Sequence, residues 1–289
     1  MFDIVGKRLW FFLLSGLLIV ISIVALVVFG LEPGIDFASG SITTLAFEQE
    51  VSLGELEQEL ATLGYTGEVE QNPHGDFLIR TVRLTTSEKA QMKASLTEKF
   101  GTLTEKAFED VDPVIAGETA RIAGIAVGVA AVGILLYITW AFHRMPRPFL
   151  YGFCAVVALL HDVILVLGVF SILGAVMGWE INLMFITGVL AVIGYSVNNT
   201  VVVFDRIREN LHRGISANFA VVVNSSLVET LSRSLNTSLT TLFVILALML
   251  FVGVSIQNFA VVLLVGIVAG TYSSLFIAPH LLVAWEKGR

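Results

Sequence analysis

Six segments of the chain are long and apolar enough to cross a membrane, and they constrain the possible folds more than any other feature of the sequence. They lie at residues 10–31, 122–142, 149–177, 181–204, 235–254 and 259–285. A membrane-spanning helix needs about 20 apolar residues. Inside the hydrocarbon layer only helices and closed barrels satisfy their own backbone hydrogen bonds. The sequence therefore predicts a polytopic α-helical membrane protein with six transmembrane helices.

The composition supports this class and argues against several kinds of partner. Hydrophobic residues make up 56% of the 289 residues and charged residues only 14%, whereas charged residues are about a quarter of a soluble domain. The net charge is −7 and the sequence has no basic stripe with interleaved aromatic residues, so we expect no nucleic-acid partner. The lone Cys154 excludes an internal disulfide and any multi-cysteine metal site, and we expect it to be a small core residue.

No motif in the sequence points to catalysis. The sequence has no nucleotide-binding loop, no nucleophile–base pair and no cluster of metal ligands. His74 and His161 lack companions at the spacing that metal ligands need. We therefore expect no enzymatic activity, no cofactor and no bound metal.

The flanking charges predict how the segments are oriented. The first segment is too long for a signal peptide and no clear cleavage pattern follows it, so we expect it to be retained. The connections at 178–180 and 255–257 carry no Lys or Arg, whereas the alternate connections and both chain ends do; these cations are Lys7, Arg8, Arg144, Arg147, Arg206, Arg208, Arg213, Lys287 and Arg289. The positive-inside rule then places both termini in the cytoplasm and the long segment 32–121 outside.

The segment between the first and second spans has the pattern of a folded domain. Strand-like runs occur at 41–49, 67–71, 77–84 and 102–110, and amphipathic helical runs at 52–63 and 86–100. Ser52-x-x-Glu55 and Thr85-x-x-Glu88 each have the spacing of a helix capping box. The order β-α-β-β-α-β is that of a ferredoxin-like domain, and its many acidic residues form either a solvated face or a docking surface for a partner or a passing chain.

These patterns predict three regions. Residues 1–31 form the cytoplasmic N-terminus and the first transmembrane helix, and residues 32–121 form an extracytoplasmic ferredoxin-like α+β domain. Residues 122–289 form a five-helix transmembrane domain with a cytoplasmic C-terminus.

The fourth span carries a polar stripe that leads into a charged cluster. Ser196, Asn198, Asn199 and Thr200 lie within its apolar run, and the charged cluster begins at Asp205. Polar side chains in hydrocarbon must face neighbouring helices or a hydrated path. Ser196, Asn199 and Thr200 share one helix face because they lie at i, i+3 and i+4. The stripe indicates an ion path rather than a passive anchor.

Two other spans carry charge. Asp162 lies mid-span beside His161, where a charged carboxylate costs at least ~2.5 kcal/mol. We expect Asp162 to be neutral or paired, either as a structural carboxyl bonded to His161 or a neighbouring helix, or as a functional acid. At the start of the fifth span, Arg233 and Thr237 share a face with Thr240 and Thr241. Arg233 is either a cation that reaches the membrane surface or part of the ion path.

Two pairs of glycines have the spacing that permits close contact between membrane helices. They are Gly124 with Gly128 and Gly266 with Gly270. Both motifs are common, so the spacing permits close helix contact without requiring it.

Four motifs carry a resemblance to a known family. They are GIDFASG from Gly34, LHDVILVLG in the third span, GYSVNNTVVVFDRIREN from Gly194, and ETLSRSLNTSLTTL from Glu229. One span, a large outer domain and five further spans is the half-unit layout of the resistance-nodulation-division superfamily. Within that superfamily the chain resembles the SecF side of the SecD/SecF family of protein translocase accessory subunits. Its residues that match the family motifs are Gly34, Asp36, Phe37, Gly194, Asp205, Arg206, Glu209 and Asn210.

The resemblance implies a function in protein export. SecF pairs with the homologous SecD in the bacterial plasma membrane, surrounded by membrane lipid, and together they form a twelve-span unit. That unit associates with the SecYEG channel and often with YajC. It is thought to use the proton-motive force to move outer domains that pull on a translocating preprotein. In the family, an acid in the fourth span with an Arg and a Thr in the fifth form the ion path. Arg233 and Thr237 match the last two.

The chain departs from the family pattern at two positions. Asn199 stands where the family has the proton-carrying Asp, and an amide resembles a protonated carboxyl but cannot ionise. A carboxylate there could pair with Arg233 when ionised and release it when protonated. This chain is therefore either trapped in one state or coupled through Asp162 or through SecD. Ser39 replaces the first of the family's paired glycines, a departure that puts little of the resemblance in doubt.

Two other functions compete with an ion-coupled translocase subunit. One is a lipid or small-molecule exporter of the same superfamily, against which the four motifs and the small outer domain argue. The other is a non-coupled scaffold subunit of the translocase, which Asn199 favours.

Overall fold

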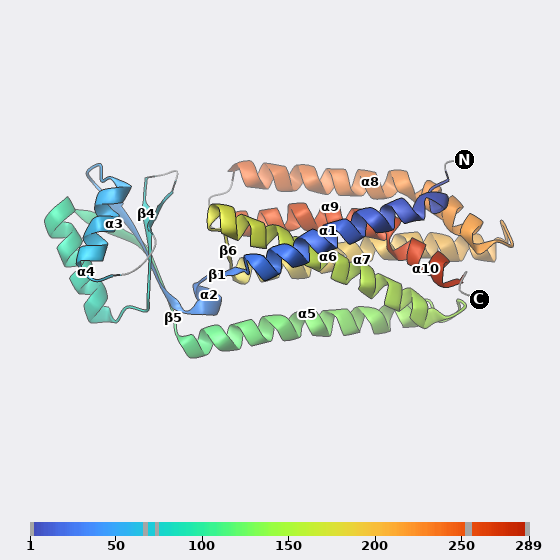
Figure 1. The fold of residues 1–289 in the computed structure, drawn as a ribbon, viewed down its shortest axis with the longest axis horizontal. Coiled ribbons are helices and arrows are strands. Elements are labelled where there is room, and N and C mark those ends of the chain that lie inside the picture. Colours follow the sequence, from blue (N-terminus) through green and yellow to red (C-terminus); the bar gives the residue numbers. More distant parts are fainter. Residues whose placement is uncertain (1–2, 66–68, 73–74, 252–255, 287–289) are drawn as a thin grey trace. The chain divides into compact units, whose positions relative to one another are not determined.

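The structure, a computed structural model, describes residues 3–65, 69–72, 75–251 and 256–286 (Figure 1). The chain divides into two compact units, one formed by residues 1–32 with 125–289 and the other by residues 33–124. Each unit has its own core, and each is described by itself.

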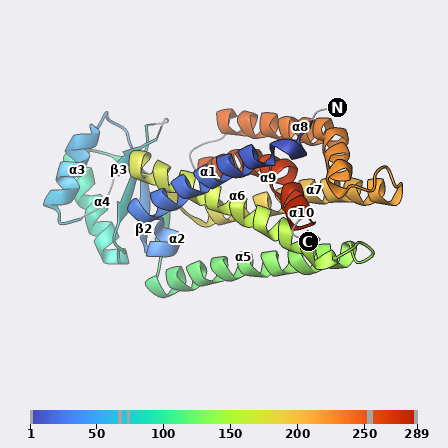
Figure 2. The same ribbon diagram turned by 45° about the vertical axis from the view of Figure 1, so that its right-hand side comes forward.

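Among the described residues, six helical segments are long and apolar enough to span a membrane, as predicted. They are η1 (Val5–Lys7) continued by α1 (Arg8–Val28), α5 (Pro113–Ala141), α6 (Pro148–Met177), α7 (Leu183–His212), α8 (Phe219–Phe251), and α9 (Gln257–Phe276) continued by α10 (Ala278–Glu286). Figures 1 and 2 show α1, α6, α7, α8 and α9 running alongside one another. The chain is therefore a multi-pass membrane protein.

Two of these helices differ from the spans expected from hydropathy. The fifth helix begins at Phe219 rather than at residue 235. Its first half is polar but stays helical inside the bundle, where Ser226 and Thr230 are buried. The sixth is interrupted at Ile277, where α9 ends and α10 begins. Pro279 follows directly, and a proline cannot donate the backbone hydrogen bond that would continue α9.

Glycines let α7 and α9 approach closely at the centre of the bundle. A Cβ atom on Gly266 would lie 2.2 Å from Val192, and one on Gly270 would lie 2.9 Å from Ser196. This glycine pair therefore lies at a close helix contact, as its spacing permits. The pair Gly124 and Gly128 is different, because a Cβ atom on either would meet no described atom within 4 Å.

The first helix packs along α6. A Cβ atom on Gly168 would lie 2.3 Å from the Cβ of Ser22, and Ser171 donates a hydrogen bond of 2.9 Å to the carbonyl of Ala25. Near the N-terminus, the Asn224 amide oxygen of α8 accepts from the backbone N–H groups of Ile4 and Val5 at 2.8 and 3.1 Å. These contacts fix α1 in the bundle and thereby position its side chains for the site described below.

In its described residues, the second unit contains a four-stranded sheet with the helices α3 and α4 between its strands. Its elements are β2 (Gly40–Phe47), α3 (Leu53–Thr62), β3 (Val69–Gln71), β4 (Phe77–Thr81), α4 (Thr86–Phe100) and β5 (Leu103–Val111). The sheet order is β3-β4-β2-β5 and all neighbours are antiparallel, with Thr43 opposite both Ile79 and Phe108. Leu45, Leu56 and Met92 are among the fully buried residues of its core. Residues 67, 68 and 74 of the predicted strand and turn lie outside the described residues.

Helix caps in this unit agree with the sequence. Thr85 and Glu88 form a complete capping box at the start of α4: Thr85 Oγ1 accepts from the Glu88 N–H at 3.3 Å, and Glu88 Oε2 accepts from the Thr85 N–H at 2.8 Å. The pKa of Glu88 is lowered by the hydrogen bond that Thr85 Oγ1 donates to its carboxylate at 2.7 Å and by the bond from the Thr85 N–H. Ser52 caps α3 by accepting from the Glu55 N–H at 3.3 Å.

The glycine-rich segment after α1 contains a short helix rather than a simple turn. Strand β1 (Glu32–Pro33) leads into α2 (Ile35–Ala38), and β6 (Glu180–Ile181) precedes α7. After α2, Ser39 has φ 66° and ψ 160°, a region that is essentially restricted to glycine. Gly40 follows with φ 140°, and a Cβ atom there would lie 2.8 Å from the carbonyl oxygen of Thr81. Ser39 therefore carries a Cβ atom in a backbone conformation suited to glycine.

Candidate functional site

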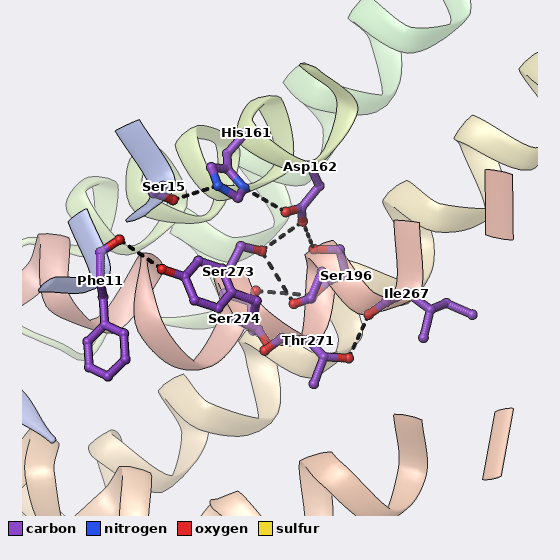
Figure 3. A network of polar contacts seen from close by, with 12 residues as sticks. Phe11, Ser15, His161, Asp162, Ser196, Ile267, Thr271, Ser273 and Ser274 are labelled. Carbon is purple, nitrogen blue, oxygen red and sulfur yellow. Dashed lines mark hydrogen bonds and ion pairs between the residues drawn. The ribbon is translucent and has the colours of Figure 1, made fainter. Parts of the chain in front are cut away.

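The centre of the membrane unit holds a buried carboxyl group that three helices contact (Figure 3). Asp162 of α6 is 1% exposed. Its Oδ1 lies 3.0 Å from Nδ1 of His161, and its Oδ2 accepts from Ser196 Oγ of α7 at 2.5 Å and from Ser273 Oγ of α9 at 2.7 Å. The close packing of α7 and α9 at Gly270 brings both serines within reach of the same oxygen atom.

His161 extends this network to the first helix. Its Nε2 lies 2.6 Å from Ser15 Oγ, and its ring stacks on Tyr272 with the centroids 6.1 Å apart. Tyr272 in turn donates to the carbonyl of Phe11 at 2.8 Å. When Asp162 is ionised, the pattern suits the tautomer in which Nδ1 carries the proton and Nε2 accepts from Ser15. The site thus joins α1, α6, α7 and α9 through polar side chains inside an apolar bundle.

A second row of hydroxyl groups lines the face of α8 that packs on α7. Its members, spaced four residues apart, are Ser226, Thr230, Ser234 and Ser238. Tyr195 donates to Ser238 at 3.0 Å, and Asn210 donates to Ser226 at 3.0 Å. Ser238 also lies 2.5 Å from Thr271 Oγ1 of α9. Because these bonds fix the antiparallel register of α7 and α8, positions 199 and 234 lie at the same level, one turn from the bond between Tyr195 and Ser238.

Asn199 is buried on the inner face of α7. It is 3% exposed, and among the described residues its Nδ2 has no hydrogen-bond partner; the same is true of Ser234 Oγ. The sequence spacing correctly put Ser196, Asn199 and Thr200 on one face, since all three are buried. An unsatisfied buried amide is costly, so this level of the bundle suits a water molecule or a change of conformation that completes the bonding.

Arg233 and Thr237 do not lie near the buried Asn199. Both are exposed on the outer face of α8, and Thr237 Oγ1 donates to the backbone carbonyl of Arg233 at 2.9 Å. No residue in the described part of the chain forms an ion pair with the Arg233 side chain. The structure therefore does not bring Arg233 to Asn199, because the residue of α8 that faces inward at that level is Ser234.

The charged motif at the end of α7 forms a separate cluster. Arg206 pairs with Glu209 at 2.5 Å and also with Glu229 of α8. Asn210 donates to Glu229 at 2.9 Å, and Asp205 pairs with Arg208 on the surface. This cluster fastens the ends of α7 and α8 together, which accounts for the density of charge in the motif.

The remaining candidate residues do not line the site. Gly194 and Asn198 are on the exposed side of α7. Gly34, Asp36 and Phe37 lie in and before α2, in the other unit. Sequence reasoning missed Ser15, Tyr272, Ser273 and Ser234. The one available signal was the rarity of hydroxyl groups in the apolar first and sixth spans.

Comparison with known proteins assigns the chain to a family. Residues 91–288 match the family described as protein export membrane protein SecD/SecF, C-terminal, and residues 24–51 match the SecD/SecF GG motif. The chain belongs to the SecD/SecF family. All the residues of the membrane site except Ser15 and Phe11 lie within the SecD/SecF C-terminal region.

Individual relatives agree with the SecD/SecF assignment. A protein of Thermobaculum terrenum named protein translocase subunit SecF is 42% identical, with 99% of this chain and 95% of the relative covered. A SecF of Anaerolinea thermophila is 39% identical, with 100% and 95% covered. The SecDF of Bacillus subtilis is 35% identical over 99% of this chain, which spans 38% of that protein.

Solved SecDF structures share the fold. The crystal structure of SecDF from Thermus thermophilus, described as a translocon-associated membrane protein, matches with a TM-score of 0.86 at 33% identity. The match covers 99% of this chain and 39% of that one. SecDF in a super-membrane-facing form matches with a TM-score of 0.71. This SecD/SecF family chain therefore corresponds to about two fifths of a SecDF protein.

Proposed function

We propose that this chain is a SecF-like accessory subunit of the Sec protein translocase, which promotes preprotein export across the bacterial plasma membrane. The observation that carries the proposal is the match of nearly the whole chain to proteins named translocase subunit SecF. These relatives are named as translocase subunits and not as enzymes. The chain covers two fifths of SecDF, and this supports a SecD-related partner for the remainder.

The proposed assembly contains SecD, the SecYEG channel and, in some cases, YajC. Both termini face the cytoplasm and the second unit faces outward, an orientation supported by the placement of Lys and Arg. The second unit is proposed to be a ferredoxin-like domain inserted between the first two spans. Its β-α-β-β-α-β order and its sheet order β3-β4-β2-β5 support that assignment.

The exposed side chains of α8 suggest how the subunit meets its partner. Arg233 is a permanent cation on a face that, within a membrane, must find an acid, a water-filled path or the membrane surface. We propose that Arg233 and Thr237 serve the ion path across the contact with SecD, rather than through Asn199 of the same chain. Proton flow down the proton-motive force would then drive the outer domains that act on the preprotein.

Asn199 supports a second candidate function, that of a scaffold subunit. A buried amide at the position of the family's acid supports a subunit that scaffolds the translocase without coupling through this position. The exporter alternative has no comparable support from the site, because the hydroxyl-lined interior of the bundle is packed by close helix contacts.

Two measurements test the proposal. Purification of the tagged full chain from its native membranes should recover SecD and SecYEG, whereas recovery without either would refute a translocase subunit. Preprotein translocation into vesicles carrying SecD should then rise with an imposed proton gradient if the subunit is coupled. A rise in translocation that is independent of the gradient would identify the scaffold function.

A further inference from the structure

We propose that Asp162 and His161 form a binding site for one proton inside this chain, separate from position 199, and that Ser273 changes its hydrogen-bond partner when the proton binds. This proposal deepens the proposed function. Only the use of the proton for export rests on the proposed function. The proton binding itself is a property of the chain alone.

The deprotonated site is fully hydrogen-bonded. Three donors reach the Asp162 carboxylate: His161 on Oδ1 at 3.0 Å, and Ser196 and Ser273 on Oδ2 at 2.5 and 2.7 Å. A carboxylate accepts several hydrogen bonds and donates none, so all three contacts are favourable when Asp162 is ionised.

The protonated site is also fully hydrogen-bonded, and only one hydroxyl group needs to turn. A proton on Oδ2 of Asp162 can be donated to Ser273 Oγ. Ser273 then directs its own hydrogen to the backbone carbonyl of Gly270, which lies 3.3 Å away. Ser196 continues to donate to the remaining lone pair of Oδ2. Both protonation states are therefore compatible with the same helix packing.

The charge balance favours the bound proton. Among the described side chains that contact the His161–Asp162 pair, Ser196 of α7 and Ser273 of α9 bond to Asp162, whereas Ser15 of α1 and Tyr272 of α9 contact His161. None of them carries a permanent positive charge. His161 is the one basic group in contact with the carboxyl, and His280 of α10 instead lies against Phe11 and the carbonyl of Ile4. Without a bound proton the site carries a net negative charge inside hydrocarbon, which is costly.

The geometry fits a proton better than a metal cation. Sodium would need several oxygen atoms whose lone pairs point into a common space. Here the carboxylate oxygens already accept three donors, and the His161 ring faces one of them. His161 also bonds to Ser15 of α1, so the proton-binding pair has a polar partner on that helix.

Infrared spectroscopy of the full chain in lipid nanodiscs tests the proposal without any partner. The carbonyl stretch of a protonated, buried carboxyl should appear as pH falls from about 10 to about 4 and should be absent in Asp162→Asn. Asp162→Glu should keep a titrating band at a shifted frequency, which guards against loss of the signal by misfolding. Glu57→Gln, a change at an exposed acid of α3, should leave the band unchanged.

The partner exchange of Ser273 has its own signature. Ser273→Ala removes one donor to the ionised carboxylate, so the midpoint of the band should move to higher pH. Ser274→Ala changes the neighbouring hydroxyl, which donates to the carbonyl of Thr271 at 3.0 Å, and should leave the midpoint in place. A midpoint that is the same in both variants would overturn the role of Ser273.

Two results would overturn the proton site itself. One is a band that stays constant across the whole pH range in the folded chain. The other is a band that responds to added sodium at fixed pH, which would identify a cation site. Neither result would bear on whether SecD and SecYEG co-purify with the chain, so the two proposals fail separately.

Discussion

Asp162 and Ser273 are 111 residues apart in the sequence and meet through a hydrogen bond of 2.7 Å at the centre of the bundle. That contact ties α6 to α9, and the bond from Ser196 to the same oxygen ties α7 to both. The Asp162 carboxyl thus accepts hydrogen bonds from both α7 and α9. Its replacement should change both the activity of the protein and the packing of these helices.

We expect Asp162→Asn to abolish any gradient-driven part of preprotein export while leaving membrane insertion and SecD binding intact. The amide keeps the size of the carboxyl and its hydrogen bonds to the serines, but it cannot bind and release a proton. The assay is translocation into vesicles carrying SecD, with and without a proton gradient. An export rate equal to that of the original chain would show that Asp162 is structural and does not supply coupling.

We expect Asn199→Asp to increase the response of export to the proton gradient. A carboxyl at this buried position can ionise, and its level on α7 faces Ser234 rather than Arg233, so its charge would bias the bundle between two states. Asn198→Asp is the matched control, because it adds the same charge on the exposed side of the same helix. Equal responses in the original chain and in Asn199→Asp would mean that the ion path runs through other residues.

We expect the segment 41–113, expressed without membrane spans, to give a soluble monomer with a cooperative thermal transition. It contains the sheet except Gly40, the first residue of β2, together with both capped helices and the buried cluster around Leu45 and Met92. Circular dichroism during heating provides the measurement. A broad, non-cooperative melt would contradict an independently folding domain.

We expect Ser39→Gly to stabilise the segment 33–124 by about 1 kcal/mol, because glycine adopts the backbone conformation of residue 39 without strain. Ser39→Ala retains the Cβ atom and should bring no such gain. Chemical unfolding followed by fluorescence or circular dichroism measures both variants. A similar stability change in both would show that the Ser39 hydroxyl, and not the backbone conformation, matters.

We expect the same segment to lose stability as the pH falls below about 4. Hydrogen bonds from Lys93 and Lys89 lower the pKa of Glu105, and a hydrogen bond from Ser41 together with the Arg83 ion pair lowers that of Asp110. A carboxyl whose pKa is lower in the folded state stabilises the fold above its unfolded pKa, and this contribution is lost as pH falls through the folded value.

The measurement is the melting temperature of the segment at about pH 7 and about pH 3. Glu105→Gln should reduce the difference between the two, because a neutral amide does not titrate and the ion pairs of Glu105 with Lys89 and Lys93, at 3.1 and 2.7 Å, are absent at both pH values. Glu57→Gln, at an exposed position of α3, should not change it. A melting temperature that is independent of pH would contradict the stabilising role of these carboxyl groups.

Features that depend on local patterns could be predicted from the amino-acid sequence alone. Runs of apolar residues specified the six spans, because a helix must cross a fixed thickness of hydrocarbon. The Thr85–Glu88 capping box set the start of α4, since its hydrogen bonds join residues three apart. The family motifs were equally readable, and so was the common face of Ser196, Asn199 and Thr200, which follows from the helical repeat alone.

Which helix faces meet depends on packing between distant parts of the chain, and the sequence pattern did not predict it. Arg233 and Ser234 are adjacent in sequence, yet Arg233 is exposed and Ser234 is buried in the bundle, because successive residues are rotated by about 100° around a helix. The start of α8 at Phe219 likewise depended on the burial of its polar half against α7. Ser15 and Ser273 contact the His161–Asp162 pair from α1 and α9. Glycine contacts and core packing determine which helices lie next to each other, and no local sequence pattern predicts that arrangement.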